Sequence, residues 1–324
     1  MNLTMKGILS ALFILLLSVG CSGQSSYLAR GWTPPVKVAD SEEGLSGGLF
    51  QHKWHGTIIA WQSLRDGSAR CFLLNRNNNT WSERRVEGLP PETASYPAID
   101  QASDIVLFHQ GYFENDQLVM SFLAGRLTES GAVRELTERK WAADKAALFG
   151  KTGPNVRLNE PGKRGWAYLG ATVMNGPDFY VAYCLNGETY SGKTVFADQG
   201  PFNNGVLHSA DSGVSWQMER ISDSQAFGPA VCRSKDYCYY FASKMIINRG
   251  YELWFSRRPA QGGSWATPKA VNKTFANRGY LAVGQADRVH LCWLDRRHEK
   301  KTLNYAHPDR GNFEALRLLA EHGS

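Results

Sequence analysis

The chain lacks the strand-to-helix turns on which several common enzyme classes depend. The strings Gly-x-x-x-x-Gly-Lys-Thr and Gly-x-Ser-x-Gly occur at 187–194 and 44–48, but neither precedes a helical pattern, so we set aside nucleotide hydrolysis and lipase chemistry. No Cys/His spacing resembles a zinc site, so we predict no metal and no cofactor. The 36 Lys and Arg residues exceed the 30 Asp and Glu residues only slightly and are spread along the chain. This charge pattern argues against a nucleic-acid partner.

Helical periodicity is scarce beyond the extreme N-terminus. The chain has 32 glycines and 12% aromatic residues, a composition typical of many short strands joined by tight turns. We therefore predict an all-β fold. No linker divides the chain after its first thirty residues, and its length suits one large all-β domain.

The first twenty residues have the pattern of a targeting segment. Lys6 precedes an almost wholly apolar run over 7–19, and the run ends shortly before Cys21. The segment resembles a bacterial lipoprotein signal, with Ser18 where that pattern usually has Leu. The resemblance implies a signal peptide over 1–20, lipidation of Cys21, a short tether over 21–30 and attachment to a membrane of the bacterial cell envelope. The alternative is an ordinary secretory signal and a secreted protein; the apolar run is short for a membrane span.

Cysteine usage leaves one pairing open. Cys232 and Cys238 flank a five-residue segment that reads as a turn, so a hairpin disulfide between them is one possibility. The remaining cysteines after Cys21 lie in apolar strand patterns, and we expect them to be buried thiols.

One octapeptide, residues 209–216, has the form Ser-x-Asp-x-Gly-x-x-Trp. Ser209 and Asp211 can accept backbone N–H bonds in a tight turn, and Gly213 can take a positive φ. Trp216 then opens the returning strand and can bury its ring against the hairpin. The octapeptide resembles the Asp-box of BNR, or sialidase-like, β-propellers. The resemblance implies a structural turn on the face opposite the ligand site.

Aromatic residues repeat at the spacing expected for propeller blades. Trp32 and Trp81 are 49 residues apart, as are Trp216 and Trp265, and Phe313 follows 48 residues later. A period of about 48 suits a four-stranded blade. We predict a single sialidase-like β-propeller over 31–324, with six blades and five as the alternative. Residues 140–165 hold either a degraded blade or an insertion.

The candidate site residues lie on the opposite face, in loops before each first strand and after each second strand. The densest loop holds Asp295, Arg296, Arg297 and Glu299. An arginine fork there could bind a sugar carboxylate, while a carboxylate orients it or moves a proton. The alternative is a solvated charged turn. Further ligand-binding or catalytic candidates are Arg278, Tyr280, Arg65, Asp66, Glu188 and Tyr190, and we expect residues 109–116 to be loop on the same face.

Three functions remain open after the comparison with active sialidases. Active sialidases carry an Arg-Ile-Pro motif near the first blade, and its arginine binds the substrate carboxylate. The corresponding residues here, 44–49, contain no arginine. Because binding of the substrate carboxylate is central to sialidase chemistry, we place first a non-catalytic module that binds a glycan or protein on the loop face. The alternatives are a glycan-degrading enzyme, either an exo-glycosidase or a polysaccharide lyase, and an envelope scaffold.

Overall fold

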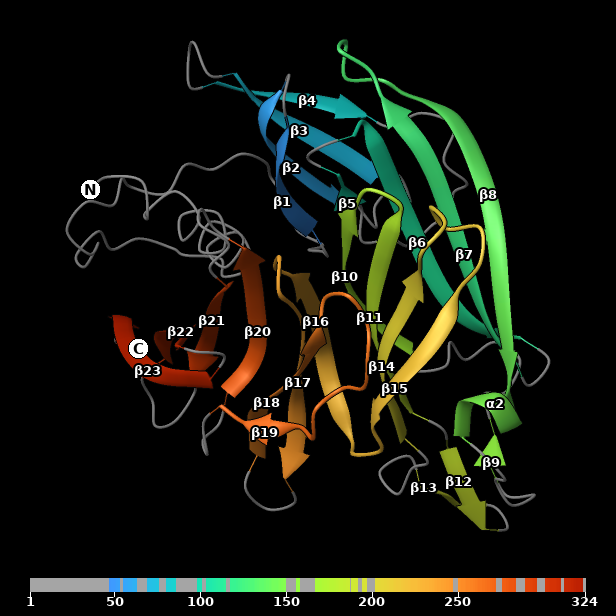
Figure 1. Cartoon of the computed structure of the whole chain (residues 1–324), viewed down its shortest axis with the longest axis vertical. Helices are drawn as coiled ribbons and strands as arrows, with labels where there is room; N and C mark the ends of the chain where they lie inside the picture. The colour runs from blue at the N-terminus through green and yellow to red at the C-terminus, as the bar shows by residue number, and fades with distance from the viewer. Residues whose placement is uncertain are drawn as a thin grey trace.

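The fold is described from a computed structural model of the chain (Figure 1). The structure describes residues 47–52, 55–62, 69–75, 80–85, 98–100, 103–114, 117–149, 156–157, 167–186, 188–191, 194–196, 202–246, 250–271, 276–283, 289–295, 301–309 and 312–322. The expected signal peptide, Cys21, the tether and the unit around Trp32 lie outside these residues.

The described chain contains five four-stranded antiparallel sheets, each with its strands in chain order. The first holds β1 (Gly47–His52), β2 (Gly56–Gln62), β3 (Ala69–Asn75) and β4 (Thr80–Arg85). The second holds β5 (Ala98–Ile99), β6 (Ile105–Glu114), β7 (Gln117–Leu127) and β8 (Val133–Asp144). The third holds β10 (Ala167–Asn175), β11 (Asp178–Asn186), β14 (Phe202–Ser209) and β15 (Gln217–Ser222). The fourth holds β16 (Ala226–Arg233), β17 (Tyr237–Ile246), β18 (Gly250–Pro259) and β19 (Lys269–Ala270). The fifth holds β20 (Ala276–Val283), β21 (Val289–Asp295), β22 (Lys301–Asp309) and β23 (Asn312–His322).

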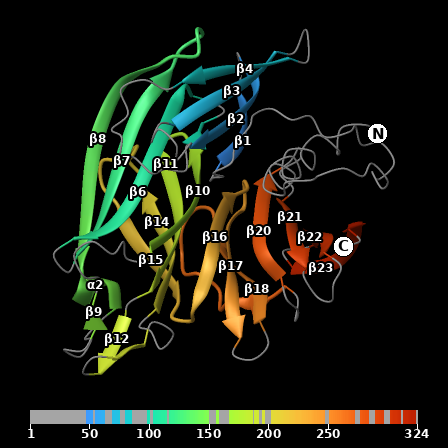
Figure 2. The same ribbon diagram turned by 180° about the vertical axis from the view of Figure 1, so that it is seen from behind.

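The sheets fan out around a common centre (Figures 1 and 2). The first strand of each sheet contacts the first strand of the next, from β1 to β5, then β10, β16 and β20. Each sheet then runs outward to its fourth strand. This arrangement is a β-propeller and confirms the predicted all-β architecture. The total number of blades and the sialidase type remain predictions.

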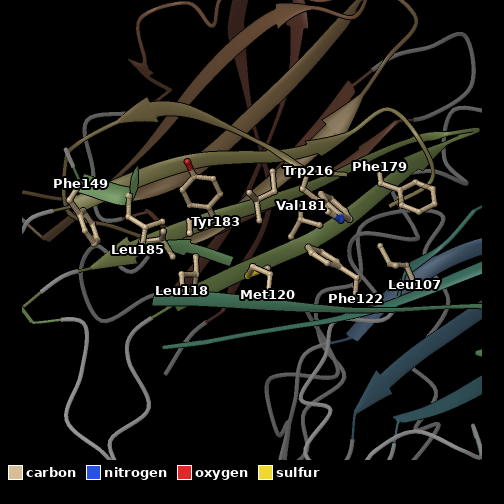
Figure 3. Packing of buried hydrophobic residues seen from close by; sticks show 13 residues of the cluster. Leu107, Leu118, Met120, Phe122, Phe149, Phe179, Val181, Tyr183, Leu185 and Trp216 are labelled. Carbon is tan, nitrogen blue, oxygen red and sulfur yellow. The ribbon is translucent and has the colours of Figure 1, made fainter. Parts of the chain in front are cut away.

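Apolar cores lie between neighbouring sheets. In β6, β11, β17 and β21, the described residues are mostly buried on both faces, so successive side chains alternate between two cores. In β17, Tyr239 and Phe241 join the cluster shared with the fifth sheet, while Tyr240 and Ala242 join the cluster shared with the third. Figure 3 shows the cluster between the second and third sheets, to which Phe149 of a short helix also contributes. Face-to-face burial between sheets therefore holds the blades together.

The innermost strands approach one another backbone to backbone. A side chain on Gly170 of β10 would place its Cβ 1.9 Å from the carbonyl oxygen of Pro229 in β16. Strand pairing is interrupted at this level in both strands, between Leu169 and Thr172 and between Phe227 and Ala230. These bulges and the missing side chain let the two strands meet near the centre.

The turn 209–216 joins β14 to β15 through its own side chains. The Ser209 hydroxyl accepts the Gly213 N–H at 2.8 Å, and Asp211 Oδ1 accepts the Ser215 N–H at 2.8 Å. Gly213 has a φ of 82°. Trp216 donates its indole N–H to the Gly213 carbonyl at 3.2 Å, and its ring stacks on Phe122 of the second sheet at 3.8 Å (Figure 3). The tryptophan therefore joins two blades as well as closing its own hairpin.

One sequence expectation is wrong, and one question that the sequence left open is answered. Residues 109–114 are not loop, because β6 continues through Glu114 and pairs with β7 along its whole length. Cys232 and Cys238 form no disulfide, because Cys238 pairs with Arg233 instead and the two thiols enter cores on opposite faces of the fourth sheet. Among the described residues, no helix is long and apolar enough to cross a membrane.

Candidate functional site

The face opposite the 209–216 turn carries two structured insertions. One follows β8 and contains α2 (Lys145–Phe149) and β9 (Val156–Arg157); the other lies between β11 and β14 and contains β12 (Glu188–Ser191) and β13 (Thr194–Phe196). The insertions join in a three-stranded sheet of order β13-β12-β9, at the lower end of Figure 1. The described part of 140–165 thus contributes to an insertion and adds no four-stranded sheet. We call this side of the propeller the loop face.

The structure brings two of the candidate residues to one corner of the loop face. Asp295 is the last residue of β21 and pairs with Ala276, the first residue of β20. Arg278 is two residues further along β20, at a bulge between Asn277 and Gly279. A guanidinium-bearing and a carboxyl-bearing residue therefore share the loop-face end of two neighbouring inner strands.

The other candidates are more scattered. Tyr280 lies further along β20, where it pairs with Cys292 of β21. Glu188 and Tyr190 are in β12, where they pair with Arg157 and Val195, so both belong to the small sheet and not to the fifth sheet. Residues outside the described part of the chain are Arg65, Asp66, Arg296, Arg297 and Glu299.

His109, expected in a loop, is instead a buried residue that links two blades. Its Nδ1 lies 3.0 Å from the hydroxyl of Thr172 in β10, and its side chain is fully buried in β6. Burial lowers the pKa of His109 to about 4, although a hydrogen bond involving the Gly170 backbone acts in the opposite direction. The imidazole is therefore neutral at pH 7, which fits a structural role.

A polar network that the sequence did not predict connects the third and fourth sheets. Glu219 of β15 accepts two hydrogen bonds from the Arg258 guanidinium, at 2.9 and 3.0 Å, and one from the Trp265 indole at 2.8 Å. His208 lies between two carboxylates, 3.3 Å from Glu219 and 3.4 Å from Asp178. Arg258 is only 3% exposed, so the ion pair with Glu219 offsets the cost of burying its charge.

The network raises the pKa of His208 and lowers the pKa of Glu219. The hydrogen bond to Glu219 raises the pKa of His208; burial opposes this rise, and the bond to Asp178 adds to it. Burial alone would raise the pKa of Glu219, but the His208 hydrogen bond and the Arg258 charge lower it below its usual range. Every charged group in the network has a partner, so the network can fasten two blades but offers no free group for chemistry.

Within the described part of the chain, no group of three or more His, Cys, Asp or Glu side chains could hold a metal ion. A groove of about 460 Å³ lies beside Trp265 and is bordered by Glu219 and Arg220 of β15. Its acidic residue is already bound within the network, so the loop face remains the better candidate.

Comparison with known proteins supports the fold. No protein-family model and no curated protein matches the chain. Among solved structures, a levansucrase from B. megaterium is 11% identical with a TM-score of 0.50, and the match covers 85% of each chain. A Bacillus subtilis levansucrase in complex with oligosaccharides is 9% identical, also with a TM-score of 0.50, over 87% of this chain and 88% of that one. A thermostable family-43 glycoside hydrolase is 11% identical with a TM-score of 0.47, over 85% and 92% of the two chains. At 9–11% identity, the likeness to the two levansucrases establishes only the fold.

Proposed function

We propose that this chain is a glycan-degrading enzyme whose active site lies on the loop face. The placement of Arg278 and Asp295 on neighbouring inner strands carries the proposal. A guanidinium can bind an anionic or hydroxyl oxygen of a sugar, and a carboxyl group can transfer a proton to or from the bond that is cleaved. The similar fold of levansucrases, one of them bound to oligosaccharides, makes a carbohydrate substrate the natural first choice.

The wider assignment belongs to the same proposal. The 209–216 octapeptide and the 48- to 49-residue aromatic spacing support a sialidase-like propeller, with a sixth blade completed by the segment around Trp32. The N-terminal pattern supports a lipoprotein attached through Cys21 to a membrane of the bacterial envelope, or a secreted protein if that cysteine is not lipidated.

The proposal is tested by turnover. The full chain, purified in mild detergent, would be assayed on fluorogenic sialosides and on panels of neutral and acidic polysaccharides, alongside Arg278→Ala and Asp295→Asn. Loss of a general acid or base lowers the rate by about 10²–10⁴-fold, so we expect Asp295→Asn to fall in this range. Arg126→Ala serves as the control, because Arg126 is 69% exposed on the second sheet and forms an ion pair with the 74% exposed Glu135.

A non-catalytic glycan-binding module is the second candidate, favoured by the missing Arg-Ile-Pro phrase. No turnover on any substrate, together with glycan binding that Arg278→Ala weakens, would support the module and refute the enzyme. Equal turnover by wild type, Arg278→Ala and Asp295→Asn would also refute the proposed site.

A further inference from the structure

A small pocket lies in the crevice between the third and fourth sheets, away from the Arg278–Asp295 corner. Its lining includes Asn204, Ser222, Ser224, Lys244, Trp254 and Pro268. Asn204 is near the start of β14, Ser222 ends β15, and Lys244 is near the end of β17, so the pocket is at the loop-face end of the crevice. The enclosed space is about 20 Å³, enough for one oxygen-sized group.

The pocket contains a buried hydrogen-bond acceptor without a donor. Asn204 is 1% exposed, and its amide nitrogen donates to the backbone carbonyls of Ser224 at 2.5 Å and Ser222 at 3.4 Å. Turning the amide over would set its oxygen against those two carbonyl oxygens, which fixes the orientation. The oxygen Oδ1 is buried and accepts no hydrogen bond from the described residues. A buried acceptor in this state is unfavourable, so the pocket is complementary to a donor.

The backbone holds Asn204 firmly in this position. Pairing between β14 and β15 shifts between Asn204 and Gly205. A Cβ on Gly205 would lie 2.0 Å from the carbonyl oxygen of Glu219, so the two strands meet too closely for any side chain there. The amide therefore cannot easily move to find another partner.

The lining of the pocket includes one cation and one aromatic ring, and a carboxylate lies next to that ring. Lys244 Nζ lies 4.1 Å above the Trp254 ring and forms no ion pair among the described residues. The Trp254 indole donates to Glu252 at 3.0 Å, and Glu252 is the cross-strand partner of Lys244. Because Lys244 and Glu252 carry opposite charges on neighbouring strands, this side of the pocket does not favour an anion over a neutral group.

We propose that this pocket receives one hydroxyl group of a neutral sugar residue that binds over it, in the glycan that the loop face acts on. One sugar hydroxyl donates to Asn204 Oδ1, Lys244 donates to a neighbouring sugar oxygen, and the apolar side of the sugar packs on Trp254. A carboxylate or sulfate offers acceptors only and cannot supply the hydrogen bond that Asn204 lacks. The inference rests on the proposed function and adds the class of one sugar residue that the loop face binds.

Calorimetric titration of the full chain in detergent tests the subsite. The probes are neutral gluco-, galacto- and fructo-oligosaccharides and, in parallel, oligo-uronates. We expect at least one neutral oligosaccharide to bind, and Lys244→Ala and Trp254→Ala each to weaken that binding by about tenfold or more. Trp254→Phe keeps an aromatic surface and should retain more affinity than Trp254→Ala. Lys140→Ala is the matched control, because Lys140 is an exposed lysine of the second sheet that pairs with Glu138 at 3.7 Å; its affinity should equal that of the wild type.

The outcomes separate this inference from the proposed function. Turnover whose KM is the same in wild type and Lys244→Ala would overturn the subsite and leave the enzyme intact. Neutral-sugar binding that is lost in Lys244→Ala, without turnover on any substrate, would support the subsite and refute the enzyme. Binding of oligo-uronates alone, or of no sugar at all, would overturn the subsite and leave an ordered water as the donor to Asn204.

Discussion

Replacing Gly170 with alanine probes the packing of the innermost strands directly. The new Cβ would stand 1.9 Å from the Pro229 carbonyl oxygen and 2.7 Å from its carbon. Both atoms belong to the backbone, so no side chain can rotate away, and β10 and β16 must separate by about 1.5 Å to restore an ordinary contact. Even a gap of about 0.5–1 Å forfeits a quarter to a half of the dispersion energy of the atoms that part.

The magnitude follows from two opposing effects. Overpacking of a well-packed site costs about 1–3 kcal/mol of unfolding free energy. Because the clash is with the backbone of Pro229, which cannot rotate away, Gly170→Ala should lie near the upper limit. The lower entropy of the unfolded alanine chain returns about 0.4–1 kcal/mol. We expect the free energy of unfolding to fall by about 2 kcal/mol, measured by urea denaturation with tryptophan fluorescence and an unchanged m-value.

Gly176→Ala is the control for this prediction. Gly176 has a φ of 60° and nothing within 4 Å of its would-be Cβ, so alanine there adds backbone strain without a clash. Its cost should be about 1 kcal/mol. If Gly170→Ala proved as stable as the wild type, or clearly more stable than Gly176→Ala, close packing of β10 against β16 would be wrong.

Three further predictions concern the contacts between blades. Trp216→Ala should cost about 3–5 kcal/mol of unfolding free energy because it empties the stack on Phe122, whereas Val214→Ala, at a 57% exposed position, should stay within about 0.5 kcal/mol. Arg258→Met should cost about 3–5 kcal/mol of unfolding free energy because it leaves Glu219 partly buried without its cation. A double variant that also changes Glu219 to Gln should recover part of this loss. If the costs of the two single changes simply add in the double variant, the two residues do not interact. The folded-state pKa of His208 is raised above its unfolded value, so its stabilisation is complete below about pH 6.5 and is lost as pH rises through the folded pKa. The stability gap between wild type and His208→Asn should therefore be wider at about pH 6 than at about pH 9, and a gap that widens with pH would refute the assignment.

Much of the fold could be predicted because it depends on local patterns. The apolar run over 179–184 and the turn residues after Ser209 locate strands and a hairpin without any knowledge of neighbouring sheets. The β12–β9 pairing could not be predicted, because it joins short segments about thirty residues apart whose individual signals are weak. Whether Cys232 and Cys238 form a disulfide depends on strand register. Cys238 pairs with Arg233, one residue after Cys232, and neighbouring residues of a strand point to opposite faces of the sheet. The sequence alone does not give this register.

The site could be predicted only in outline. Strand order assigns Arg278 and Asp295 to the loop face, but their shared corner depends on the pairing of β20 with β21. Alternation could have placed His208 and Glu219 on one face of the third sheet, since Glu219 pairs with Val206, two residues before His208. Their partner Arg258 comes from another sheet, and no local pattern indicates which blades meet. The unpaired oxygen of Asn204 likewise emerges only after two backbone carbonyls have fixed its amide.

A crystal structure of the full chain soaked with a neutral oligosaccharide would test the central claim, that the loop face binds glycans, most directly. We expect sugar density over the loop-face ends of β20 and β21, with one hydroxyl directed at Asn204 in the neighbouring crevice. Sugar density confined to the groove beside Trp265, or to the face that carries the 209–216 turn, would contradict the claim.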